Sequence, residues 1–96
     1  INDVIVDLAR IIQPNMNIVD ARVGVEGWNG PKTHTLNAFI MGRDPGSVDA
    51  VMTQIMGFEP STIRHLVDSV KYGLGSLDPE VTGEKIESVM VQFDPP

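Results

Sequence analysis

The chain has 96 residues, enough for one domain with a modest hydrophobic core. Its 42% hydrophobic and 21% charged residues argue against a disordered chain, and its apolar runs are too short for a transmembrane helix or a signal peptide. The formal net charge of −6 opposes binding to nucleic acids and anionic membranes, which depends on clustered Lys and Arg.

The sequence contains no cysteine. Disulfide bonds, thiolate metal sites and cysteine-ligated iron–sulfur clusters are therefore excluded within this chain. Because small secreted domains usually carry disulfides, this absence favours a reducing, cytoplasmic compartment. The chain starts at Ile1 without an initiator Met, so we expect a fragment of a longer protein.

The first element predicted from the sequence is a helix. Apolar residues recur at helical spacing from the start of the chain. Asn2 or Asp3 is expected to cap this helix, and Pro14 disfavours helical geometry at Gln13, where we expect it to stop.

Two strands are predicted next, over residues 18–25 and 35–41, because both segments alternate or are rich in β-branched residues. The connection, 26–34, is too short for a parallel crossover, so we expect an antiparallel pair. Gly24 is expected to mark a bulge or a close backbone approach. One face of the first strand is expected to carry Val19, Ala21, Val23 and Val25.

Two further helices follow the second predicted strand. Ser47 is placed to cap the first of them, and Gly57 is placed to end it. Pro60 suits the first turn of the other helix, which Gly73 or Gly75 is expected to end.

The end of the chain predicts one more strand. Residues 77–84 form a polar connection, and the Val- and Met-rich residues 86–93 favour an extended conformation. The expected fold is a single domain over 1–96, α/β or alternatively α+β: a small two-layer sandwich with a mixed sheet of three to four strands and helices mainly on one face. Its expected core comprises Val19, Val23, Leu36, Ile40, Val51, Ile55, Leu66 and Val70.

Several short motifs occur in a fixed order along the chain. They are IVDARVGVEGWNGP, MGRDPGSVDAVMTQIMGFEP and GLG. This pattern resembles the domain of unknown function family 362, over most of this chain and the later part of the family's domain. The resemblance implies a redox or iron–sulfur setting, because such domains often occur beside ferredoxin-type cysteine motifs. Any cluster would then be held by a segment outside this chain, and no particular reaction is implied.

Four carboxylates lie at the edges of the predicted elements. Clustered carboxylates without His or Cys suit a hard cation, so Mg²⁺ or Mn²⁺ is the metal that this set favours. The alternative is structural, with Asp44 in a turn, Asp49 complementing the helix dipole and the others paired with Arg22 or Arg43. The four candidates are Asp20, Glu26, Asp44 and Asp49.

The glycine-rich loop between the strands is a second candidate site, with Gly27, Trp28 and Gly30 as its ligand-facing residues. It leads into a strand and not into a helix N-terminus, which counts against nucleotide binding. The alternative is a constrained connection with Trp28 packed over a sheet edge. Arg43 is placed to assist an anion at the start of the next helix, although its acidic neighbours oppose one.

The sequence leaves three hypotheses for function. The first, which the absence of catalytic spacing favours, is a non-catalytic or partial module completed by the rest of a longer chain. The second is a small-ligand or divalent-metal enzyme domain with a carboxylate-lined site. The third is a protein-interaction module, for example a homodimer, that pairs through a poorly protected sheet edge at residues 89–91.

Overall fold

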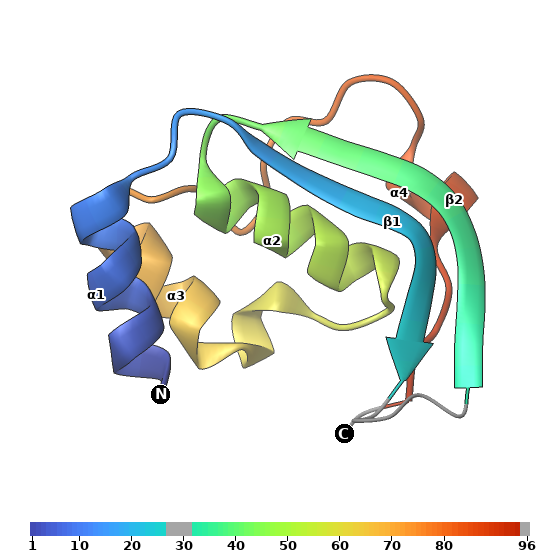
Figure 1. Cartoon of the computed structure of the whole chain (residues 1–96), viewed down its shortest axis with the longest axis horizontal. Coiled ribbons are helices and arrows are strands. Elements are labelled where there is room, and N and C mark those ends of the chain that lie inside the picture. Colours follow the sequence, from blue (N-terminus) through green and yellow to red (C-terminus); the bar gives the residue numbers. More distant parts are fainter. Residues whose placement is uncertain (27–31, 95–96) are drawn as a thin grey trace.

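The computed structural model describes residues 1–26 and 32–94. They form a mixed α+β fold in which a long curved hairpin covers a layer of helices (Figure 1). None of the helices in these residues has the length and apolar character needed to cross a bilayer. In chain order the elements are α1 (Asn2–Ile12), β1 (Asn17–Glu26), β2 (Lys32–Gly42), α2 (Pro45–Ile55), the 3-10 turn η1 (Pro60–Thr62), α3 (Arg64–Lys71) and α4 (Ile86–Val89).

The sheet consists of β1 and β2 alone within the described residues. They are antiparallel, as predicted, with a register that runs from Asn17 opposite Gly42 to Glu26 opposite Lys32. The expectation of a mixed sheet with three to four strands is therefore wrong for this part of the chain. The fold is α+β, the alternative that the sequence left open.

A β-bulge in the hairpin changes which residues face inward. Ala21 pairs with Ala38 but Val23 pairs with Thr35, so β2 carries one more residue than β1 in this interval. Asn37 accommodates the extra residue with a left-handed φ of +52°. Beyond the bulge the side-chain alternation of β1 is reversed, which contradicts the single face that the sequence predicts. The residues that turn outward are Val23 and Val25, which are 56% and 54% exposed.

The predicted last strand over 86–93 is wrong as well. Its first residues form α4, and the following extended residues bond to the end of α2 and not to the sheet. The Val91 N–H donates to the Ile55 carbonyl at 2.8 Å, and the Phe93 N–H donates to the Met56 carbonyl at 2.9 Å. The last carbonyls of a helix have no partner within the helix, so this segment satisfies them.

The ends of the helices differ in part from the expectations. Helix α2 starts at Pro45 with Asp44 in the N-cap position, and no side-chain bond caps it. Ser47 lies inside the first turn, where its hydroxyl accepts a hydrogen bond from the Ser76 N–H at 2.9 Å. Gly57 follows the helix with a φ of +86°, in agreement with its predicted role.

The hydrophobic core lies between α2 and the inner face of the hairpin. Four predicted core residues are buried, namely Leu36, Val51, Ile55 and Leu66. Val19 and Ile40 are partly buried against the core. Val23 and Val70 are not core residues, since they are 56% and 39% exposed. The core also includes Ala21 and Phe93.

Truncation of Leu66 is expected to destabilise the fold strongly. Leu66 on α3 is 2% exposed, so Leu66→Ala should lower the free energy of unfolding by about 2–5 kcal/mol, measured by urea denaturation. Val70→Ala on the same helix is the control, and it should cost less than about 1 kcal/mol because Val70 is 39% exposed and lies outside the core. Equal losses would show that α3 does not pack as described.

Candidate functional site

The C-terminal part of the chain is tied to both ends of α2. At the start of the helix, the Gly46 N–H donates to the Leu74 carbonyl at 2.9 Å. At its end, the Val91 N–H donates to the Ile55 carbonyl at 2.8 Å. Residues 76–89, which lie between these two attachments, form a segment that we call the strap. The strap runs past β2 on its way from one attachment to the other (Figure 1).

Glycines allow the close approach at the start of the strap. A Cβ atom at Gly75 would overlap the backbone nitrogen of Ser47, and Gly75 has a φ of +154°. A Cβ atom at Gly46 would lie 2.9 Å from the Leu74 carbonyl oxygen. Residues with side chains at these positions would therefore push the strap away from α2.

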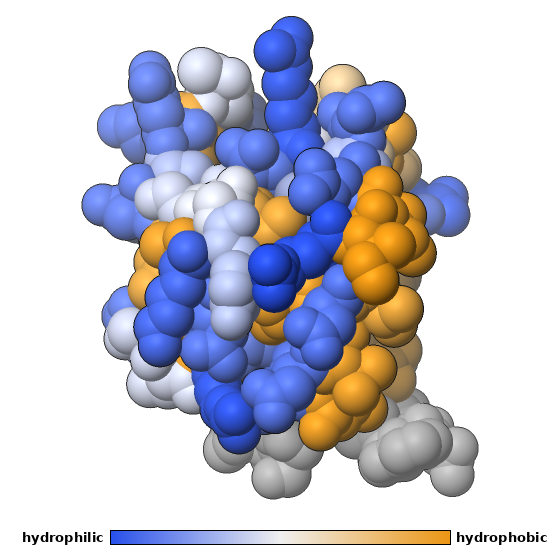
Figure 2. Space-filling model, turned by 90° about the vertical axis from the view of Figure 1, so that its left-hand side faces the viewer, coloured by the Kyte–Doolittle hydropathy of each residue, from blue (hydrophilic) through white to orange (hydrophobic). Residues whose placement is uncertain are grey.

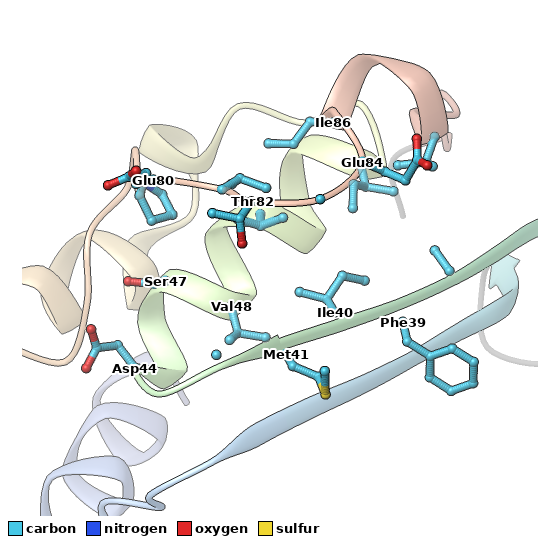
Figure 3. Close-up of a pocket in the computed structure, with 18 of the residues that line it drawn as sticks. Phe39, Ile40, Met41, Asp44, Ser47, Val48, Glu80, Thr82, Glu84 and Ile86 are labelled. Atoms are coloured by element: carbon cyan, nitrogen blue, oxygen red, sulfur yellow. The ribbon is translucent and has the colours of Figure 1, made fainter.

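A groove of about 700 Å³ lies between β2, α2 and the strap (Figure 3). One wall consists of the consecutive residues 37–44, which cover the end of β2 and the turn into α2. In Figure 3, Ile40 points from β2 toward α2, whereas Phe39 and Met41 point away. Because residues from both faces of the strand line it, the groove follows the edge of β2. The apolar residues that line its other walls are Val48, Val51, Ile55, Val81, Ile86 and Val89.

The edge of β2 that does not face β1 is unpaired. Within residues 1–26 and 32–94, no backbone hydrogen bond joins β2 to any segment other than β1. At the end of β2, the side-chain amide of Asn17 on β1 donates to the carbonyls of Gly42 and Arg43, at 3.3 and 3.1 Å. An unpaired edge presents N–H and C=O groups that a further strand can use.

The charge on the groove is mainly negative. Three exposed carboxylates line it, from Asp44, Glu80 and Glu84, against one cationic side chain among the described lining residues, Arg43. None of these four makes an ion pair in the part of the chain that the structure describes. The Glu84 carboxylate accepts a hydrogen bond from the Ser88 hydroxyl at 3.4 Å.

Asp20 does not face the groove, because it lies on the outer side of β1 and pairs with Arg22. The Arg22 guanidinium is 3.0 Å from the Asp20 carboxylate. The hydrogen bonds from Arg22 hold the pKa of Asp20 below its usual value. This pairing is the structural alternative that the sequence offered for Asp20.

Glu26 lies at the far end of the hairpin and pairs with His34. The Glu26 carboxylate and His34 Nε2 form a largely buried contact, because the antiparallel register brings the two strand ends together. The Phe93 ring packs on the imidazole with ring centroids 4.5 Å apart. Phe93 also lies against Gly24, where an added Cβ atom would clash with the ring. Gly24 therefore marks a close approach, as expected.

Asp44 is the N-cap residue of α2, at the opposite end of the hairpin from Glu26, and Asp49 lies in α2 beyond its first turn. Partial burial raises the pKa of Asp49, and the positive charge of His65 lowers it in opposition. The four candidate carboxylates are thus not brought together. No group of three or more His, Asp or Glu side chains able to hold a metal ion occurs in residues 1–26 and 32–94.

The remaining sequence-predicted site residues divide into two groups. Gly27, Trp28 and Gly30 lie outside the described residues. Arg43 lines the groove beside Asp44. Sequence reasoning missed the contributions of Glu80 and Glu84, because nothing local in residues 76–89 indicates that they pass beside β2. The Glu26–His34 pair was accessible from the register of an antiparallel hairpin.

These features define a small α+β module with a groove along an open strand edge. The chain belongs to the family described as Domain of unknown function (DUF362), whose model matches residues 1–54, more than half of the 96 residues. This match confirms the family resemblance across α1, the hairpin and nearly all of α2. The strap lies beyond the matched residues. No curated protein and no solved structure matches the chain.

Substitution of Gly75 is expected to detach the strap. Gly75→Ala should lower the free energy of unfolding by about 2–4 kcal/mol, from left-handed strain and from overlap with α2. Gly73→Ala is the matched control, because Gly73 also has a positive φ, +73°, but no atom lies within 4 Å of its added Cβ. It should cost about 1 kcal/mol, all from strain. Urea denaturation measures both, and equal losses would contradict the packing of Gly75 on α2.

The pKa values of two aspartates are expected to shift in opposite directions. Folding lowers the pKa of Asp20, so its stabilising effect is present above the usual value of 3.8 and is lost as the pH falls. Folding raises the pKa of Asp49, so its ionisation opposes folding as the pH rises through the folded-state value. NMR titration should show both shifts. Arg22→Gln should return the pKa of Asp20 toward 3.8 and leave the pKa of Asp49 unchanged. An equal change in both pKa values on this substitution would contradict these local causes.

Proposed function

We propose that this chain is a non-catalytic module that binds another polypeptide segment as an added β-strand along the edge of β2. The observation that carries the proposal is the groove beside that edge, which is lined by residues 37–44. Its occupant is a strand from outside the described residues, either from a further part of a longer chain or from a partner protein.

The geometry of the groove suits a strand. Neighbouring strands lie about 4.8 Å apart, and an extended peptide in the groove would have β2 on one side and the strap on the other. The volume of about 700 Å³ is in the range of binding pockets.

Apolar surface outside the core gives further support. The outer face of the hairpin exposes Ile18, Phe39 and Met41, each more than 60% accessible. Figure 2 views the end of the molecule at which α1 lies, and apolar atoms gather along one side of that face. On α1, Leu8 is 53% and Ile12 is 70% exposed. Exposed apolar patches of this kind mark contact surfaces for other polypeptides.

The setting of the partner forms part of the proposal. The family resemblance is our reason for proposing a redox or iron–sulfur setting, and the absence of cysteine is our reason for proposing a cytoplasmic one. With no cysteine in this chain, the cysteine ligands of any cluster would belong to the bound segment or to a neighbouring one. On this view the chain is the later part of a larger family domain, and it supports a site completed elsewhere.

Binding of Mg²⁺ or Mn²⁺ is the alternative function. Its support is the Asp49 carboxyl in α2, whose pKa is raised by burial, together with Asp44 in the N-cap position of the same helix. The separation of Glu26 and the pairing of Asp20 with Arg22 weaken it.

Strand addition is tested with peptides from a random seven-residue display library. The best binder is synthesised in three forms: unmodified, and N-methylated at either of the two sets of alternate residues. We expect binding of the unmodified peptide to shift the NMR signals of residues 37–44. One methylated form should bind at least about tenfold more weakly, because only one edge of an added strand donates N–H groups to β2.

Three results would overturn this proposal. One is that no peptide perturbs residues 37–44, and another is that both methylated forms bind equally well. The third is dimerisation of the chain through the same edge, detected by sedimentation, which would identify a second copy as the occupant.

A further inference from the structure

The positions of the carboxylates in the groove indicate the chemistry of its partner. Figure 3 shows Asp44 and Glu80 near one end of the groove and Glu84 near the other, with Ile40, Val48 and Thr82 between them. The groove thus has a largely apolar middle and a carboxylate at each end. Arg43 is the single cationic side chain among the described lining residues.

These carboxylates are available to a ligand. Asp44, Glu80 and Glu84 are exposed, and no ion pair satisfies them in the described residues. The net charge of the chain, −6, adds a field of the same sign. An anionic segment would be repelled at both ends of the groove, whereas Lys or Arg side chains would be attracted there.

We propose that the groove binds an extended polypeptide segment that carries Lys or Arg near each end and apolar side chains between them. This inference rests on the proposed function and adds the chemical class of the bound strand. Along β2, residues 37–42 span roughly 20 Å at about 3.3 Å per residue, which matches a strand of five to seven residues. Apolar side chains at alternate positions of that strand face α2, and the basic residues reach the carboxylates from its ends.

Other occupants fit less well. An α-helix, about 10 Å across with its side chains, uses its own backbone groups internally and leaves the N–H and C=O groups of β2 unpaired. A small organic cation would reach one end of the groove but not the other. An extended basic segment is the occupant that uses both the unpaired edge of β2 and the carboxylates at the two ends of the groove.

The test starts from the peptide selected above and compares forms ending in Lys, Glu and Gln. At low salt we expect the Lys form to bind about tenfold more tightly than the Glu form, with a preference that weakens as salt rises. The variant Asp44→Asn, Glu80→Gln, Glu84→Gln should remove most of this preference. Its three positions are exposed, so the fold should be retained, which circular dichroism checks.

A matched control separates local from overall charge. The variant Asp7→Asn, Asp78→Asn, Glu87→Gln removes the same number of carboxylates from exposed positions that do not line the groove. It should keep the preference for Lys. Equal loss of preference in both triple variants would overturn the inference, because the net charge alone would then explain binding.

The remaining outcomes distinguish this inference from the proposed function. If the Gln or Glu form binds as tightly as the Lys form and still shifts residues 37–44, strand addition stands and the basic partner is wrong. If no form shifts those residues, the proposed function fails as well. If butylamine displaces the bound Lys peptide as effectively as added Lys peptide does, the site recognises a small cation and not a strand.

Discussion

The groove depends on the backbone hydrogen bonds that attach the C-terminal segment to the two ends of α2. A helix leaves unpaired N–H groups at its start and unpaired C=O groups at its end. Here Gly46 donates to Leu74 at one end, and Ile55 and Met56 accept from Val91 and Phe93 at the other. These bonds fix where the strap begins and ends, and so place it beside β2.

Phe93 joins the hairpin to the same helix. Phe93 continues past the end of α2 into the core and packs on His34, next to the Glu26–His34 pair. The bulge at Asn37 makes this possible, because it changes the alternation of β1 so that Gly24 and Glu26 face inward. One bulge thus determines both the outer apolar surface of the hairpin and the packing at its far end.

Local patterns in the sequence were sufficient for part of this fold. Pro14 gave the end of α1, and the β-branched segments gave an antiparallel pair with Leu36 in the core. They failed where a distant contact decides the outcome. The valines near the end of the chain favour a strand by composition, but the free carbonyls of α2 offer them a different partner. The candidate carboxylates failed to meet for a similar reason, since the hairpin places Glu26 far from α2's start.

The attachment of the strap at both ends also bears on the order of assembly. The strap leaves the ribosome after α1, the hairpin and α2, so these elements can fold while the edge of β2 is still uncovered. On the proposed function, a segment laid along β2 during that interval would have the strap on its other side once Val91 and Phe93 reach the end of α2. Opening of those bonds would then make its departure easier. Residence time on this module would therefore depend on local unfolding of residues 76–93 as well as on the contacts of the bound segment.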